Sequence, residues 1–275
     1  MARGLFQTNW VVALKPEGRA VIEKFGLTPS GERGLFPVFT SGDQSMQLVV
    51  SGPGKVQAAA ATAHLASLPS TRSADATVWI NFGIAGSGGP DYGKTYLAGK
   101  IEDLAVGKSW YPVATWSRKR DLERRTIRTV DQPCGDYPDG DALVEMEASG
   151  FYPVATRMAG AELCHVLKVV SDDPGHPIHL IDKAIAKQLC QVALDHAADW
   201  FSALCELGQE EADRLGDPPG FREILKAAHF TVTQQHQLRR LLQQWQARNG
   251  DLLFSAGNEN AREILHRLRN GVSSP

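Results

Sequence analysis

The chain has 275 residues, of which 43% are hydrophobic and 22% are charged, as in ordinary soluble globular proteins. Its 29 lysines and arginines nearly balance 31 aspartates and glutamates, for a formal net charge of -2. This balance gives no overall attraction to nucleic acid or an anionic membrane, and no run of about 18 apolar residues predicts a membrane-spanning helix. We therefore expect a cytoplasmic protein with one large α/β domain and room for a small appendage.

The first part of the chain alternates predicted strands with predicted helices. A short apolar strand is predicted over 10–14, and Pro16 opens the helix that follows, because proline is tolerated in a first turn. The next elements are strands over 35–39 and 46–50, an alanine-rich helix over 54–68, and a buried strand over 76–81 that runs into glycines.

The alternation continues to about residue 207. After a segment over 100–106 and a turn near Trp110, we predict a strand over 126–130, a helix over 147–157, a buried strand over 165–170 and a helix over 179–207. The last helix would bury one broad face that carries Ile181, Ile185, Leu189, Val192, Trp200 and Leu204. The pattern indicates an α/β fold with a mixed, mainly parallel twisted central sheet flanked by helices.

The composition changes at residues 216–220, Gly-Asp-Pro-Pro-Gly, and the rest reads as helical. Apolar residues recur at helical spacing over 238–245 and 264–268, and Thr231 with Gln234 forms a possible capping box. We divide the chain into a main domain, 1–207, and a C-terminal helical extension, 208–275. Charges of both signs balance from residue 206 onward, which favours a solvated surface over nucleic-acid binding.

No metal or cofactor site is indicated by the sequence. The four cysteines are scattered without metal-ligand spacing and are expected to be reduced, mostly buried thiols: Cys134, Cys164, Cys190 and Cys205. No Gly-x-Gly-x-x-Gly follows the first strand and no Walker sequence occurs, so neither dinucleotide nor ATP binding is favoured. His165, on a predicted buried strand, is expected to be a core histidine.

Acidic and small residues follow four of the predicted strands. They are Glu17, the glycine stretch 83–89, the triplet 145–147 and the run 171–173. Ligands of open α/β sheets bind beyond the carboxyl ends of the strands, so these residues are expected to share one cleft. Cleavage of an N-glycosidic bond needs an acid for the departing base, groups that hold the ribose hydroxyls, and a base that activates water. Three carboxylates in different environments could fill these roles.

The order of the motifs resembles the nucleoside phosphorylase and nucleosidase superfamily, and most closely its methylthioadenosine/S-adenosylhomocysteine nucleosidase branch, over about residues 9–205. The resemblance rests on Gly52-Pro53-Gly54-Lys55-Val56, Asn81-Phe82-Gly83-Ile84-Ala85-Gly86, Ala98-Gly99-Lys100-Ile101, Val144-Glu145-Met146-Glu147-Ala148 and Ser171-Asp172. It implies a nucleoside phosphorylase-like fold, a small-molecule nucleoside as ligand, and a homodimer or larger homo-oligomer.

The resemblance also implies roles for individual residues. Asp172 would protonate the leaving base and Glu17 would activate water. Glu147 would hold the ribose hydroxyls, and Met146 would pack on the sugar. Lys168 stands where nucleosidases have an arginine near the attacking water. The remaining residues expected to bind the nucleoside are Ala85, Gly86, Ser171 and Phe151.

Two departures from the family pattern bear on the substrate. Ile84 occupies a position where nucleosidases commonly offer a serine hydroxyl toward the nucleophile. The connection from Val130 to Val144 is short and lacks the usual aromatic segment that stacks on the base. Tyr137, Phe151 or Tyr152 could replace it, and the identity of the base stays open.

Hydrolysis of a purine-type or 5'-modified nucleoside is therefore the leading hypothesis, and phosphorolysis is the alternative. The chain lacks the Gly-Asp-Pro-x-Arg loop of the phosphorylases, although Lys15, Arg19 and Lys168 could gather an anion. A second alternative is a nucleoside-binding module with weak turnover. Structural roles also stay open for Glu17, as a carboxylate at a helix N-terminus, and for Asp172, as an N-cap.

Overall fold

The computed structural model describes residues 5–31, 34–113, 122–133, 137, 142–250, 254–257 and 259–273. It divides into two compact units, Leu5–Ala212 and the segment from Asp213 to the C-terminus, and the division falls inside one helix. Cys134 lies outside the described residues, whereas Cys164, Cys190 and Cys205 are free thiols, as expected.

The first unit is built on one sheet. Its described strands are β1 (Phe6–Val12), β2 (Thr28–Pro29), β3 (Val38–Thr40), β4 (Met46–Val50), β5 (Ala76–Ser87), β6 (Thr95–Asp103), β7 (Lys108–Trp110), β8 (Arg124–Thr129), β9 (Ala142–Glu145) and β10 (Cys164–Asp172). They follow the order β10-β6-β8-β9-β5-β1-β4-β3-β2, and β7 pairs with β6.

The sheet closes on itself through an additional pairing. β10 runs antiparallel to β6 and parallel to β5, so the path from β10 through β6, β8 and β9 returns to β5 as a barrel. Among the described strands, five pairings are parallel and five are antiparallel. The expectation of a mainly parallel sheet was therefore wrong: the sheet is mixed, and β1, β4 and β5 form its parallel centre.

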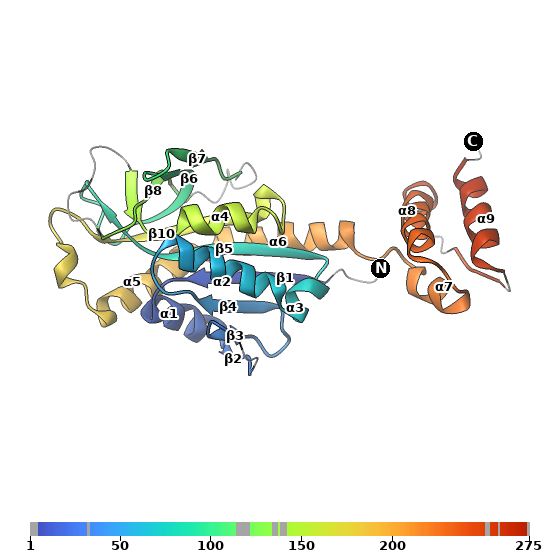
Figure 1. Ribbon diagram of the computed structural model, residues 1–275, viewed down its shortest axis with the longest axis horizontal. Coiled ribbons are helices and arrows are strands. Elements are labelled where there is room, and N and C mark those ends of the chain that lie inside the picture. The colour runs from blue at the N-terminus through green and yellow to red at the C-terminus, as the bar shows by residue number, and fades with distance from the viewer. Residues whose placement is uncertain are drawn as a thin grey trace. The chain divides into compact units, whose positions relative to one another are not determined.

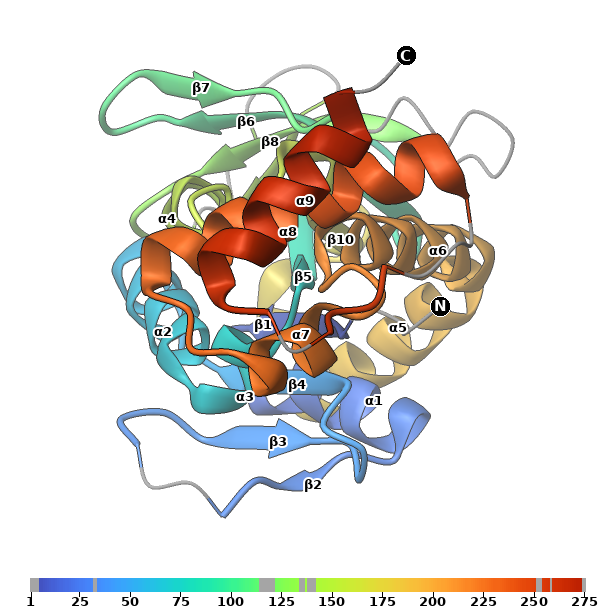
Figure 2. The same cartoon turned by 90° about the vertical axis from the view of Figure 1, so that its right-hand side faces the viewer.

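Helices cover both faces of this sheet (Figures 1 and 2). The described α-helices of this unit are α1 (Lys15–Phe25), α2 (Lys55–Ser67), α3 (Pro69–Ser73), α4 (Ala148–Ala155), α5 (Lys183–His196) and α6 (Ala198–Leu215); short 3₁₀ turns span Ala161–Leu163 and Ile178–Leu180. Helices α1 and α5 pack together on one face, and α2 and α4 on the other. Pro16 lies in the first turn of α1, as predicted, and Gly26, with a φ of 64°, ends this helix in the left-handed conformation.

The core has two layers because alternate residues of a strand point to opposite faces of the sheet. Trp10 and Val12 of β1 pack toward α1 and α5, whereas Val11 packs toward α2 and α4. His165 on β10 is buried, with Nε2 2.8 Å from the carbonyl oxygen of Glu162, and is a core histidine as expected.

Several predicted elements differ from the structure. The strand predicted over 10–14 is β1 (Phe6–Val12), and the one predicted over 35–39 is β3 (Val38–Thr40). The helix predicted over 179–207 is divided at Ala197 into α5 and α6, and Val192 is exposed instead of lying on the buried face. The glycines after residue 82 do not leave the sheet: β5 continues to Ser87, because Gly86 and Ser87 pair with β9.

The second unit is helical. Its helices after α6 are α7 (Phe221–Ala227), α8 (Val232–Asn249) and α9 (Ala261–Ser273), which share an apolar cluster that includes Leu238, Leu242 and Ile264. The predicted capping box is confirmed: the Thr231 hydroxyl accepts from the Gln234 amide, and the Gln234 side chain accepts from the Thr231 amide. None of the described helices combines the length and apolar character needed to cross a membrane.

Helices α2 and α4 approach each other at a glycine. A Cβ added at Gly150 of α4 would lie 1.8 Å from the carbonyl oxygen of Lys55 at the start of α2. The contact positions α4 directly behind the triplet 145–147.

Gly150→Ala should therefore push the two helices apart and lower the free energy of unfolding by about 1–3 kcal/mol, the usual cost of overpacking. Urea denaturation followed by circular dichroism measures this loss. Gly42→Ala is the matched control, because a Cβ there meets nothing within 4 Å. Equal stability of the two variants would contradict the close contact.

Candidate active site

A cavity of about 230 Å³ opens where β1, β5, β9 and β10 end. The structure brings to it residues from all four predicted strand exits: Glu17, Ala85, Gly86, Met146, Glu147, Ser171 and Asp172. Ile84, Val144, Glu145 and Tyr137 also line it. The carboxylates of this cavity are held in three different ways.

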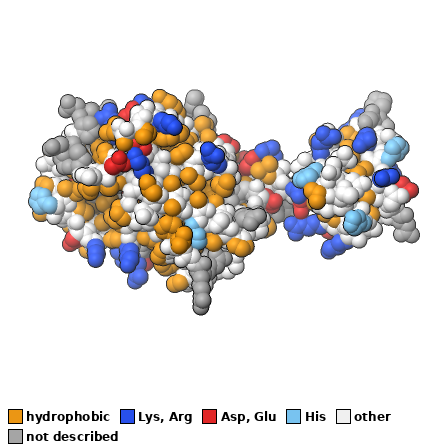
Figure 3. Space-filling model, viewed as in Figure 1, with side chains coloured by type: hydrophobic (Ala, Val, Ile, Leu, Met, Phe, Trp, Pro, Cys, Tyr) orange, Lys and Arg blue, Asp and Glu red, His pale blue; other side chains and the backbone are white. Residues whose placement is uncertain are grey.

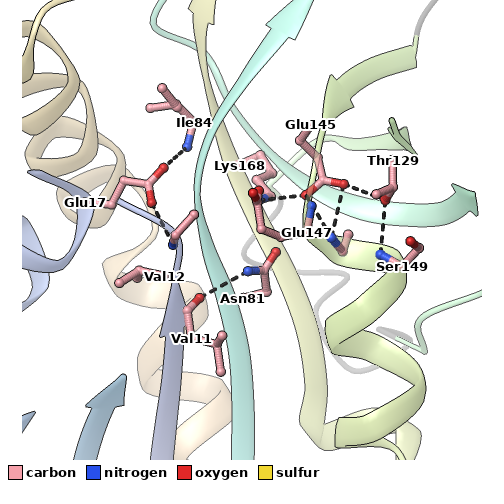
Figure 4. Close-up of polar contacts among 12 residues, drawn as sticks. Val11, Val12, Glu17, Asn81, Ile84, Thr129, Glu145, Glu147, Ser149 and Lys168 are labelled. Atoms are coloured by element: carbon pink, nitrogen blue, oxygen red, sulfur yellow. Dashed lines mark hydrogen bonds and ion pairs between the residues drawn. The ribbon is translucent and has the colours of Figure 1, made fainter. Parts of the chain in front are cut away.

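Glu17 is buried in the first turn of α1 and is held by backbone amides. Its Oε2 accepts hydrogen bonds from the amides of Ala13 and Leu14, at 3.0 and 2.7 Å. Its Oε1 accepts one from the amide of Ile84 at 3.0 Å (Figure 4). The bond from Leu14 caps the helix, so the structural role considered for Glu17 is real. The same carboxylate also faces the cavity.

Glu145 is a structural carboxylate. Its Oε2 lies 2.9 Å from Nζ of Lys168, and the amides of Glu147 and Ala148 donate to it at 2.9 Å. The Thr129 hydroxyl donates to its Oε1 at 2.6 Å. Glu145 thereby holds the first amides of α4 and pairs with the buried ammonium of Lys168.

Glu147 points from the end of β9 toward the start of α2. Its Oε1 accepts a hydrogen bond from the Gly54 amide at 2.8 Å, and its Oε2 lies 3.6 Å from Nζ of Lys168. Burial raises the pKa of Glu147, Lys168 opposes this rise, and Glu145 adds to it. Glu147 thus lies farther from the ammonium than Glu145 does.

Lys168 on β10 links these carboxylates. Its side chain is 1% exposed. Burial by itself would lower the pKa of Lys168, but the charges of Glu145, Glu147 and Glu17 raise it above the ordinary value, so the ammonium stays charged. Three carboxylates around one ammonium leave an excess of negative charge, and burial raises the pKa of Glu17 to about 7 against the lowering effect of Lys168. Near neutral pH, Glu17 is therefore present in both its protonated and its ionised form.

The glycines of β5 let side chains approach the strand. A Cβ at Gly83 would lie 2.5 Å from Oε1 of Glu17, and one at Gly86 would lie 2.7 Å from Oδ2 of Asp172. Their role is close approach to two carboxylates, and the chain does not turn here.

Asp172 ends β10 and is buried. It pairs with Gly86 of β5, which pairs with Val144 of β9 on its other side. The Ser171 hydroxyl donates to its Oδ1 at 2.5 Å, and the Tyr137 hydroxyl donates to its Oδ2. Both carboxylate oxygens are therefore engaged by hydroxyl groups, which a ligand could replace.

Some predicted residues lie elsewhere. Phe151 and Tyr152 are buried in the apolar cluster between α4 and the sheet and are not among the residues lining the cavity, so Tyr137 is the one of the three aromatic candidates that reaches it. Arg19 pairs with Glu23 on the exposed side of α1, and neither Arg19 nor Lys15 lines the cavity. Lys168 forms ion pairs with Glu145 and Glu147 and does not itself line the cavity.

Sequence reasoning missed other lining residues. Ile178 and Ile181 reach the cavity from the 3₁₀ turn that follows β10, and Pro53 reaches it from the turn before α2. Only the glycine-proline spacing before α2 could have predicted that Pro53 lines the cavity. The two isoleucines carry no local sequence signal that distinguishes them from core residues.

No family model and no curated protein matches the sequence. Solved structures do match the fold. A 5'-methylthioadenosine/S-adenosylhomocysteine nucleosidase of Helicobacter pylori is 14% identical with a TM-score of 0.58, over 72% of this chain and 99% of that chain. The futalosine hydrolase of the same organism is 15% identical with a TM-score of 0.57, over 72% and 98%. A 5'-methylthioadenosine nucleosidase of Arabidopsis thaliana is 17% identical with a TM-score of 0.58, over 74% and 97%.

The chain has the fold of these nucleosidases. They belong to the nucleoside phosphorylase and nucleosidase superfamily, which is the superfamily that the sequence motifs indicated. The nucleosidase fold is matched almost from end to end, while part of the present chain lies outside the match.

The raised pKa of Glu17 predicts a pH-dependent stability. An acid whose pKa is about 7 in the folded chain and 4.5 ordinarily binds more protons when folded than when unfolded. Its contribution to the free energy of unfolding is therefore full below pH 4.5 and is lost as pH rises through about 7. From pH 4.5 to 8, the wild type should lose about 3 kcal/mol of unfolding free energy relative to Glu17→Gln. Urea denaturation across this range measures the difference.

Glu206→Gln, at an exposed glutamate of α6, is the control and should follow the wild type. If Glu17→Gln shows the same pH dependence as the wild type, Glu17 does not hold the proton.

Proposed function

We propose that the chain hydrolyses the N-glycosidic bond of a purine-type or 5'-modified nucleoside. The observation that carries the proposal is the single cavity in which Glu17, Glu147 and Asp172 meet in three different environments. Its support from outside the chain is the fold, which it shares with nucleosidases. One of those structures, from Helicobacter pylori, holds a nucleoside analogue, butyl-thio-DADMe-Immucillin-A.

The base is proposed to lie at Asp172. In its protonated form this carboxyl group donates a proton to the departing base, which leaves as a neutral molecule. Ser171 holds one oxygen of Asp172, and Tyr137 lies against the other, where its ring can contact the base. Ala85 and Gly86 line the cavity beside Ser171 and Tyr137.

The ribose is proposed to lie at Glu147. Gly54 occupies one position on its carboxylate, and the remaining lone pairs can accept hydrogen bonds from the ribose 2'- and 3'-hydroxyls. Met146 lines the cavity next to Glu147 and offers an apolar surface to the sugar. As the sugar becomes cationic, the negative charge of the carboxylate stabilises it.

Glu17 is proposed to activate the attacking water. A general base works best when its pKa lies near the working pH, and burial raises the pKa of Glu17 to about 7. Ile84 beside it contributes its amide to Glu17 and an aliphatic side chain to the cavity, so Glu17 alone would orient the water there.

Phosphorolysis is the second candidate, and the charges of the cavity disfavour it. A phosphate dianion needs several charge-assisted donors. Among the described residues that line the cavity there are carboxylates but no arginine or lysine, and the nearby ammonium of Lys168 is paired with Glu145. Water is therefore the better nucleophile for this site.

A homo-oligomer remains part of the proposal. Val56 on α2 is 74% exposed and Met158, just after α4, is 52% exposed. Apolar side chains are spread over this face of the first unit, which carries α2 and α4 (Figure 3). This is the apolar surface that a second copy of the chain could cover.

Incubation with 5'-methylthioadenosine, adenosine or inosine, with and without phosphate, tests the reaction. Free base released without phosphate is the expected result, measured by chromatography. Release that requires phosphate would establish phosphorolysis instead. Tight binding without release would establish a binding module.

Asp172→Asn should reduce kcat by about 10²- to 10⁴-fold, because the amide cannot donate a proton to the base. Glu147→Gln should reduce kcat/KM by a comparable factor through loss of the charge that faces the ribose. Steady-state rates measure both, circular dichroism checks folding, and Glu206→Gln serves as the unaffected control. Normal rates in both variants would refute the assigned site.

The rate should also report on Glu17. If its ionised form activates water, kcat falls about ten-fold for each pH unit below about 7. Glu17→Gln should be slow and should lack this dependence. A wild-type rate that is flat between pH 5 and 8 would exclude Glu17 as the base.

A further inference from the structure

A second cavity adjoins the first. Its volume is about 600 Å³, and Asp173, Pro174, Pro177 and His179 are among its lining residues. Tyr137 and Ile178 line both cavities. The second cavity is therefore adjacent to the candidate active site and shares two wall residues with it.

The second cavity adjoins the candidate active site at the end where Asp172 lies. The Tyr137 hydroxyl, which marks the boundary between the two cavities, donates to Asp172, and Asp173 next to it lines the second cavity. Glu17, Glu147 and Met146 line the first cavity and are not among the residues that line the second. The added space thus lies beside the proposed base and away from the proposed ribose and water.

The walls of the second cavity combine an apolar side with the polar side chains of Asp173 and His179. Pro174, Pro177 and Ile178 present carbon atoms. The one described carboxylate in the lining, Asp173, has its oxygens occupied: it accepts from the amides of Tyr92 and Gly175 and lies 3.0 Å from Nδ1 of His176. Both oxygens of Asp173 are therefore already engaged by groups of the chain itself.

Purine geometry connects the two cavities. The 6-position of a purine lies on the same edge as N7, so a base that presents N7 to Asp172 directs a substituent on its 6-amino group along the same side, past Tyr137. We propose that the substrates are purine nucleosides whose exocyclic 6-amino group carries an extended apolar substituent, and that the second cavity binds this substituent. This inference rests on the proposed nucleoside hydrolysis at the first cavity.

The test compares adenosine, N6-benzyladenosine and 5'-methylthioadenosine as substrates of the full chain. N6-benzyladenosine should have a kcat/KM at least about ten-fold above that of adenosine, because a well-filled apolar pocket discriminates by this order. His179→Trp, at the second cavity, should remove the preference while leaving adenosine cleavage unchanged. His196→Trp, at an exposed histidine of α5 that lines neither cavity, should behave as the wild type. Pro174→Trp repeats the block from another wall.

The two hypotheses fail in different ways. Cleavage of adenosine or 5'-methylthioadenosine with no gain for the N6-benzyl compound overturns the further inference and leaves the proposed function standing. A preference that survives both tryptophan variants also overturns it. If no nucleoside is bound or cleaved, the proposed function fails and the inference fails with it.

Discussion

The site depends on one buried ammonium group. The side chain of Lys168 on β10 is 1% exposed. Its Nζ lies 2.9 Å from the Glu145 carboxylate and 3.6 Å from the Glu147 carboxylate. A buried charge without partners would be costly, so Lys168 and Glu145 require each other. Burial raises the pKa values of Glu17 and Glu147, Lys168 opposes this rise, and a neighbouring carboxylate adds to it in each case.

Helix N-termini supply the second constraint. Glu17 lies in the first turn of α1, Glu145 caps α4, and Glu147 accepts a bond from Gly54, which begins α2. Amides at a helix start favour negative charge, and they fix each carboxylate in position without a cationic side chain. The cavity can therefore hold several carboxylates with few cations around them. Such a negatively charged site suits a developing positive charge on a sugar and does not suit phosphate.

Closure of the sheet brings these parts together. β10 pairs with β5 along its length and with β6 on its other side, which places Lys168 opposite Gly83 and Asp172 opposite Gly86. Gly83 and Gly86 then leave room for Glu17 and for Asp172 with Tyr137. The same geometry leaves the space beyond Tyr137 that forms the second cavity.

The sequence by itself determined the local elements and the order of the motifs, because proline at a helix start, apolar alternation and acidic strand ends are short-range signals. It also indicated the superfamily whose fold the chain has. Tertiary structure decided the rest. Barrel closure, the break at Ala197, the burial of Phe151 and the position of Tyr137 at the cavity depend on contacts between residues far apart in the chain, for which local patterns carry no information. The pairing of Lys168 with Glu145 also depends on tertiary structure, since an alternating strand shows which face a side chain takes and not what lies opposite it.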